Sequence, residues 1–169
     1  MSRDLLLEIG TEEVPAHAMS ALLQDLKRLA GEMFEEKRLG YENIRTIGTP
    51  RRTALIVTGL AERQEDVRTR MRGPSVAIAF DAEGTPTKAG AGFARSHGID
   101  PSALMQHDGY VYATVHEKGM ETAQLLTDLL PELIRAIPLP NSMRWGDLDF
   151  RFIRPIRWIA ALYGAEVVP

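Results

Sequence analysis

The sequence predicts an α+β fold, with a mixed or antiparallel sheet and two main amphipathic helices. Apolar residues recur at every third or fourth position in residues 16–39 and 121–137, as on the buried side of a surface helix. Short strand-like runs lie around these segments, without the strict alternation of a doubly wound sheet. At 169 residues we expect two small packed subdomains, an N-terminal α/β subdomain over 1–74 and a second α+β subdomain over 75–169.

The N-terminal subdomain begins with a short apolar run. Residues 4–9 end at Gly10 and are too few for a stable helix, so they predict a buried strand. The helix over 16–39 follows. Pro15 suits the first turn of this helix, and Gly40 suits its C-terminal end.

Two further strand-like runs, residues 44–47 and 53–60, predict a hairpin, because Pro50 between them favours a turn. Residues 62–72 are highly charged and lead into the Gly-Pro pair at 73–74. This change of composition places the expected subdomain boundary after residue 74.

The second subdomain begins with small elements. Thr87 is a good cap for a short helix over 88–97, and Pro101 begins another helical turn. Residues 110–116 alternate between apolar and polar side chains, which predicts a strand with one buried face.

The helix over 121–137 contains Pro131, which we expect to kink or restart it. The last segment, residues 150–163, is apolar and aromatic. Pro155 within this segment predicts an edge strand or a bulged strand.

Composition narrows the class of protein. The chain has no Cys, which excludes disulfide frameworks, thiolate zinc sites and cysteine nucleophiles. Neither a membrane span nor a signal peptide is evident, so we expect a cytoplasmic protein that does not bind membranes. A net charge of −3 excludes a strongly basic nucleic-acid-binding domain. Residues 40–74 nevertheless carry a net charge of +3 and form a basic island between acidic flanks.

Glu12 and Glu13 are the first candidates for chemistry, because neighbouring carboxylates can act as acid and base. Adjacent strand residues point to opposite faces, so a facing pair would require a turn in the loop. The segment Gly90–Arg95 begins like a dinucleotide-binding motif, but Arg95 replaces its third glycine. The four histidines of the chain are His17, His97, His107 and His116, and their spacing does not match that of metal ligands. We therefore expect no metal site and no self-sufficient active site.

Two clusters combine arginine with aromatic residues, one in the basic island and one near the C-terminal end. Guanidinium groups beside aromatic rings can bind phosphates and stack on bases, as RNA recognition requires. Alternatively, acidic residues such as Asp147 and Asp149 pair with these arginines inside the fold or across an interface. The candidates for RNA or subunit contact are Arg51, Arg52, Arg144, Trp145, Arg154 and Arg157.

Several motifs in series resemble one known family, the bacterial glycyl-tRNA synthetase β subunit. Their order and spacing match over essentially the whole chain. Thr53 and Gly48 depart slightly from the usual family pattern. The matching stretches are Leu6–Pro15, Thr49–Leu55, Arg72–Pro74 followed by Ala79–Gly84, Ser142–Gly146 and Phe152–Trp158.

The resemblance implies an enzyme of α and β subunits, expected as an α2β2 tetramer. In such an enzyme the α subunit would bind ATP, magnesium and glycine, and the β subunit would bind tRNA(Gly). Family members continue for several hundred residues, so we expect this chain to be an N-terminal fragment that needs no cofactor and is inactive alone. Glu12 and Glu13 would then serve an interface or position other groups.

Two other hypotheses remain open from the sequence alone. One is a stand-alone RNA-binding or protein-interaction module unrelated to aminoacylation. The other is a small independent enzyme that uses Glu12 or Glu13.

Overall fold

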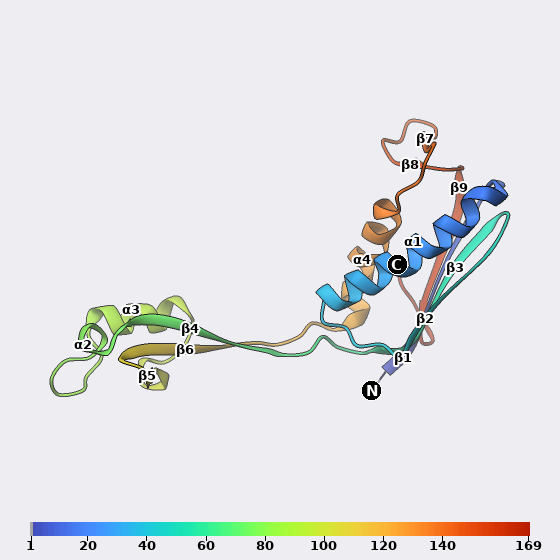
Figure 1. Cartoon of the computed structure of the whole chain (residues 1–169). Coiled ribbons are helices and arrows are strands. Elements are labelled where there is room, and N and C mark those ends of the chain that lie inside the picture. Colours follow the sequence, from blue (N-terminus) through green and yellow to red (C-terminus); the bar gives the residue numbers. More distant parts are fainter. Residues whose placement is uncertain (1) are drawn as a thin grey trace. The chain divides into compact units, whose positions relative to one another are not determined.

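The computed structural model describes residues 2–169, and its contacts divide the chain into two compact units (Figure 1). Unit 1 consists of Met1–Glu65 and Met120–Pro169, and unit 2 is the intervening segment Asp66–Gly119. Helices and antiparallel strands occur in both units, which confirms the predicted α+β class.

Unit 1 is built on a five-stranded antiparallel sheet in the order β10-β9-β1-β3-β2. A separate two-stranded hairpin, β7-β8, precedes β9. The elements of unit 1 are β1 (Ser2–Thr11), α1 (Ala16–Glu36), β2 (Asn43–Thr49), β3 (Arg52–Ala61), α4 (Thr122–Ala136), β7 (Met143–Arg144), β8 (Arg151–Phe152), β9 (Ile156–Tyr163) and β10 (Glu166–Val167).

The central strand β1 confirms the strand expected over residues 4–9. Leu5, Leu7 and Ile9 alternate along β1 and are fully buried. They share one core with buried residues of α1 and α4, and Figure 1 shows both helices on the same side of the sheet. The opposite sheet face therefore has no helix over it in unit 1.

Helix α1 ends earlier than the sequence predicts, at Glu36 instead of residue 39. Arg38 adopts a left-handed φ of 55°, and the Leu39 N–H donates to the Phe34 carbonyl at 2.8 Å. These features form a Schellman-type end in which Arg38 takes the position usually occupied by glycine. The expectation that Gly40 ends the helix was wrong.

Helix α4 continues through Pro131 without a restart. Pro131 lacks an N–H, so the Thr127 carbonyl one turn earlier loses its helical partner. Both residues lie on the exposed side of α4, where water can hydrate that carbonyl. The buried side of the helix keeps its apolar contacts.

Of the two expectations for the segment with Pro155, an edge strand was wrong, whereas an irregular strand agrees with the structure. Pro155 lies between β8 and β9, and β9 pairs with β1 on one side and β10 on the other, so it is not an edge strand. The register between β1 and β9 shifts between Gly10 and Thr11, close to where Pro155 precedes β9.

Unit 2 is a three-stranded antiparallel sheet in the order β4-β6-β5 with short helices. Ala94, Leu104 and Ala113 form its small core. The predicted helix cap is present, since the Thr87 hydroxyl accepts from the Gly90 N–H at 3.3 Å. The elements are β4 (Val67–Ser75), α2 (Val76–Ala79), α3 (Lys88–Ser96), η1 (Pro101–Ala103), β5 (Met105–His107) and β6 (Tyr110–Glu117).

The division into units does not coincide with the expected subdomains 1–74 and 75–169. Strand β4 pairs with β6, so residues 66–74 belong with unit 2. Residues 120–169 return to unit 1, because β9 pairs with β1. Local composition carries no signal for pairing between strands so distant in sequence.

Candidate functional site

Three segments meet at one end of the unit 1 sheet. They are the loop after β1, the β2–β3 turn and the residues just before β9. The Thr11 N–H donates to the Arg51 carbonyl at 3.0 Å, and the Val14 N–H donates to the Pro50 carbonyl at 2.7 Å. The Glu12 N–H donates to the Pro155 carbonyl at 3.1 Å. The loop after β1 is therefore fixed between the other two segments.

Four of the predicted arginines and two predicted carboxylates come together at this end. We call this set, with Glu8, the arginine–glutamate cluster: Glu8, Glu12, Glu13, Arg51, Arg52, Arg154 and Arg157. Sequence motifs pointed to six of its members, whereas Glu8 was not predicted. Glu8 belongs to β1 two residues before Gly10, and only the register of β1 with β3 places it near Arg52.

Three ion pairs link the segments of the cluster. Arg51 Nη2 lies 3.1 Å from Glu13 Oε1, and Arg157 Nε lies 3.6 Å from Glu12 Oε1. Arg52 Nη1 lies 3.6 Å from Glu8 Oε1. The arginine side chains are about two-thirds exposed (66–67%), so each pair contributes little to stability, on the order of 0–1 kcal/mol. Such exposed guanidinium groups stay accessible to a partner.

Arg154 differs from the other arginines because it contacts backbone. Its Nε donates to the Glu13 carbonyl and its Nη1 to the Ile153 carbonyl, both at 3.0 Å. Arg154 is only partly exposed. Its guanidinium group thus holds the loop after β1 in place, which is a positioning role.

Trp158 adds an aromatic surface next to the cluster. Trp158 pairs with Gly10 in the β1–β9 ladder, and its indole lies directly over that glycine. The Arg52 Cζ atom lies 5.7 Å from the centre of the ring. Trp158 remains 42% exposed, so part of its surface is available for contact.

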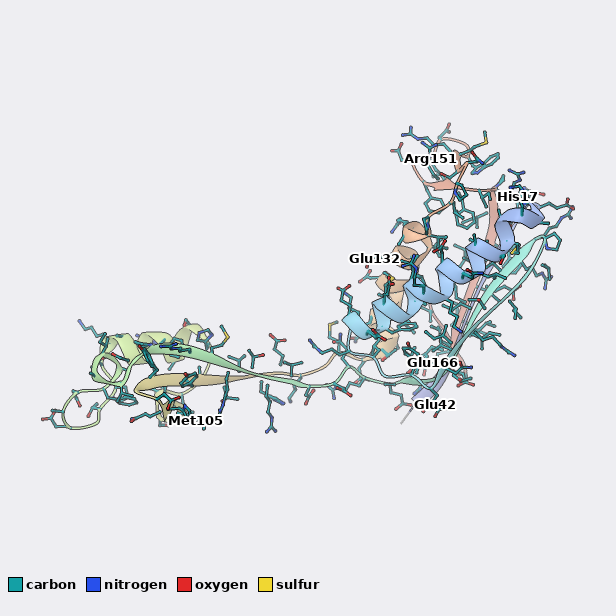
Figure 2. The ribbon with its side chains drawn as sticks, viewed as in Figure 1. His17, Glu42, Met105, Glu132, Arg151 and Glu166 are labelled. Carbon is teal, nitrogen blue, oxygen red and sulfur yellow. The ribbon has the colours of Figure 1, made fainter. Side chains whose placement is uncertain are left out.

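Arg144 and Trp145 belong to a second set of contacts, in the β7–β8 hairpin that the Arg151 label marks in Figure 2. Arg144 Nη1 lies 3.3 Å from Asp149 Oδ1. Trp145 Nε1 donates to the Phe152 carbonyl at 3.0 Å. These contacts stabilise the hairpin, and Arg144 is 64% exposed.

The geometry of Glu12 and Glu13 favours positioning over acid–base chemistry. The two carboxylates approach different arginines on different segments, Arg157 and Arg51. Because each carboxylate pairs with its own arginine, the two are not placed together as an acid and a base.

A groove of about 400 Å³ lies between α4 and β9 in unit 1. Its lining is mostly apolar, including Leu126, Ile134 and Phe150, and Arg135 is its one charged lining residue. The groove thus has a mostly apolar lining and lacks the paired titratable groups that acid–base chemistry uses.

Metal-binding clusters and membrane-spanning helices are both absent from residues 2–169. No group of three or more His, Asp or Glu side chains in this range is placed to hold a metal ion. None of the helices described in this range is long and apolar enough to cross a membrane.

An antiparallel sheet with one open face, exposed arginines and an exposed tryptophan together form a surface suited to binding a partner, and the class they define is a binding module. The family model for the glycyl-tRNA synthetase beta subunit matches residues 5–169. The chain therefore belongs to the glycyl-tRNA synthetase β subunit family.

Curated relatives agree with this family. The chain is 50% identical over 168 residues to a glycine–tRNA ligase beta subunit of Halothermothrix orenii, covering 99% of this chain and 24% of that protein. It is 48% identical over 173 residues to that of Desulfitobacterium hafniense and 49% identical to that of a Geobacter species, covering the whole chain and 25% of each. The chain thus spans about a quarter of the length of these relatives.

Proposed function

We propose that this chain is the N-terminal part of the β subunit of a heteromeric glycine–tRNA ligase, where it supports tRNA(Gly) binding and α-subunit association without an active site of its own. The family match over residues 5–169 carries this proposal. In the whole enzyme, an α2β2 tetramer in the cytoplasm, the α subunit binds ATP and magnesium.

The arginine–glutamate cluster is the surface we assign to this role. Arg51 and Arg52 present exposed guanidinium groups, which suit contact with the tRNA backbone. Arg154 holds the loop that supports them, and Glu13 and Glu12 of this loop pair with Arg51 and Arg157. Arg144 and Trp145 in the β7–β8 hairpin offer a second exposed contact region.

Reconstitution tests the proposal as a whole. The complete β subunit that contains this chain is mixed with the α subunit of the same organism, and tRNA(Gly) charging is measured. We expect charging only with both subunits present. The 169-residue chain alone should show no glycine-dependent ATP–pyrophosphate exchange, and exchange by the chain alone would refute the absence of an active site.

The assigned roles of the arginines can be separated in the reconstituted enzyme. Arg51→Ala/Arg52→Ala should weaken tRNA binding and reduce the slope of log Kd against log salt by about 1 for each phosphate that the variant no longer neutralises. Arg154→Ala should lower the melting temperature and leave that slope unchanged. A lowered melting temperature with an unchanged slope for the Arg51/Arg52 variant would assign these residues to structural pairing instead.

The carboxylates are tested in the same enzyme. Glu12→Gln and Glu13→Gln should reduce α/β association or tRNA affinity, with charging at saturating tRNA affected only through assembly. If either variant abolished charging while association and tRNA affinity stayed normal, Glu12 or Glu13 would have to be a catalytic residue.

A further inference from the structure

The unit 2 sheet presents a row of arginines beside tyrosines. Residues directly opposite each other in an antiparallel ladder share a face, and so do residues two apart on one strand. The β4–β6 register therefore gathers seven side chains on one face, which we call the arginine face: Arg68, Arg70, Arg72, Tyr110, Tyr112, Thr114 and His116.

The other face of this sheet is occupied by the unit 2 helices. Val111 and Ala113 of β6 are fully buried, and Ala113 packs in the core with Ala94 of α3. Met105 of β5 pairs with Tyr112, and Figure 2 shows it on the side of the sheet away from α3. The arginine face is thus left without a helix over it in unit 2.

The arginines of this face differ from those of the arginine–glutamate cluster. Within residues 2–169, none of the guanidinium groups of Arg68, Arg70 and Arg72 forms an ion pair with a carboxylate. The Arg72 Cζ lies 3.7 Å from the centre of the Tyr110 ring, a stacked cation–π contact. Three positive charges therefore lie on this face without a neutralising acid.

The acidic residues near the arginine face lie at its two ends and contact histidines. Asp66 Oδ2 is 3.4 Å from His116 Nε2, and Asp108 Oδ2 is 3.0 Å from His107 Nδ1. Glu117 pairs with Val67 and belongs to the other face. Positive charge on this face thus adjoins aromatic rings, of which Tyr110 is 36% exposed and Tyr112 is partly buried.

We propose that the arginine face binds unpaired RNA, as a single-stranded segment of the tRNA that the proposed function assigns to this protein, on which this inference rests. Arginines two residues apart repeat every ~6.8 Å along β4, a spacing similar to that of successive phosphates in an extended strand. The Tyr110 ring with the Arg72 guanidinium stacked on it, and the exposed part of Tyr112 beside it, offer flat surfaces for unpaired bases. In an RNA duplex the bases stack on one another, and the tyrosines have no free base to contact.

Fluorescence anisotropy with the 169-residue chain tests this proposal. The probe is a labelled single-stranded RNA of twelve nucleotides of mixed sequence, compared with the same RNA annealed to its complement across a potassium chloride series. The variants are Arg68→Ala/Arg70→Ala and Tyr110→Leu. The matched control is Lys88→Ala/Arg95→Ala, which removes two positive charges from α3 in the same unit, and circular dichroism verifies folding of each variant.

The arginine variant should bind the single strand at least tenfold more weakly at moderate salt, with a slope of log Kd against log salt reduced by about 1.4, or about 0.7 for each phosphate contact. Tyr110→Leu should weaken binding roughly tenfold with an unchanged slope, because stacking releases no counterions. The control variant should bind like the unmodified chain, and the duplex should bind more weakly than the single strand.

Three results would overturn the inference. Equal losses in the arginine variant and the control would indicate general charge attraction, and equal binding of duplex and single strand would exclude a role for unpaired bases. Normal RNA binding by the variants, with the reconstituted enzyme still charging tRNA(Gly), would reject this surface and leave the proposed function intact. The expected RNA binding without tRNA(Gly) charging would instead reject the proposed function alone.

Discussion

At the scale of single residues, the contact between Gly10 and Trp158 shows why a small residue occupies this end of the central strand β1. The indole lies over Gly10 on the open sheet face, where any Cβ would overlap it. Gly10 was expected only to end a strand, yet it lies within β1 and makes room for an aromatic ring. An aromatic residue across from a strand glycine covers the backbone that the glycine leaves bare.

Gly10→Ala should therefore destabilise the chain by about 1–3 kcal/mol, because the indole must move. Urea unfolding followed by circular dichroism measures this cost. In a Trp158→Ala background the same substitution should cost clearly less, since the overlapping ring is gone. An equal cost in both backgrounds would show that the ring does not limit the space at Gly10.

Tyr163 is a second residue whose environment has a measurable consequence. Its side chain is buried, and its hydroxyl lies 2.9 Å from the Ala61 carbonyl and 3.1 Å from the Leu60 carbonyl. Burial raises the pKa of Tyr163 above its ordinary value. The folded state thus holds this proton more tightly than the unfolded state does.

Stability supplied by Tyr163 should be complete below about pH 10, the ordinary tyrosine pKa, and should be lost as pH rises toward the raised pKa of the folded state. Tyr163→Phe should cost about 1–2 kcal/mol at neutral pH, because it removes the hydrogen bonds from the Tyr163 hydroxyl to the Leu60 and Ala61 carbonyls. The difference in the free energy of unfolding between the unmodified chain and Tyr163→Phe should become smaller at alkaline pH. Urea unfolding from pH 7 to 11 measures it, and a constant difference over this range would contradict the assignment.

At the scale of elements, the end of α1 departs from the usual sequence rule. Arg38 holds the left-handed conformation that costs a side-chain-bearing residue about 1–2 kcal/mol, and the buried Leu39 follows it. The Arg38 Nε is buried without a hydrogen-bond partner among the described residues. Gly40, only two residues later, is the glycine that the sequence pattern favours for this role.

Arg38→Gly should raise the free energy of unfolding by about 0.5–1 kcal/mol, because glycine adopts this conformation without strain. The gain should appear as a higher melting temperature. Arg38→Ala is the control, since it also removes the side chain but keeps a Cβ in the left-handed conformation. If alanine stabilised the chain as much as glycine, loss of the buried guanidinium would explain the effect instead of backbone strain.

The elements also show what the sequence can and cannot predict. Strand β1, the hairpin of β2 and β3, and both long helices follow from apolar periodicity, which is a local property. Strand β4 was missed because the charges of residues 62–72 suggested a subdomain boundary, although Val67, Thr69 and Met71 alternate with arginines in a regular strand pattern. This alternation was the available signal for the arginine face.

The candidate site was predicted by residue type but not by partner. The motifs selected Arg51 and Glu13, yet their pairing depends on contact between segments 38 residues apart. The bond from Arg154 to the Glu13 carbonyl spans 141 residues. Such partners are set by the register of the sheet and not by the local sequence pattern. The sequence alone therefore could not show which arginines pair within the fold and which are exposed for contact.

At the scale of the whole molecule, unit 2 is inserted between the two stretches of unit 1, and each unit has its own core. The two ends of unit 1 that border the insertion lie side by side. The Gln64 N–H donates to the Met120 carbonyl at 3.0 Å, and the Thr122 N–H donates to the Glu62 carbonyl at 2.9 Å. These bonds resemble the base of a hairpin, which a short turn can close.

Replacing residues 66–119 by an Asn-Gly turn should therefore leave unit 1 folded. We expect cooperative thermal unfolding at a temperature near that of the whole chain, since all the buried residues of the unit 1 core remain. Adding Leu126→Ala to the shortened chain should cost about 2–5 kcal/mol, which verifies that the transition reports on this core. The shortened chain should lose single-strand RNA binding while the reconstituted β subunit that carries the deletion still associates with α. Non-cooperative unfolding or aggregation of the shortened chain would show that unit 1 requires the insertion to fold.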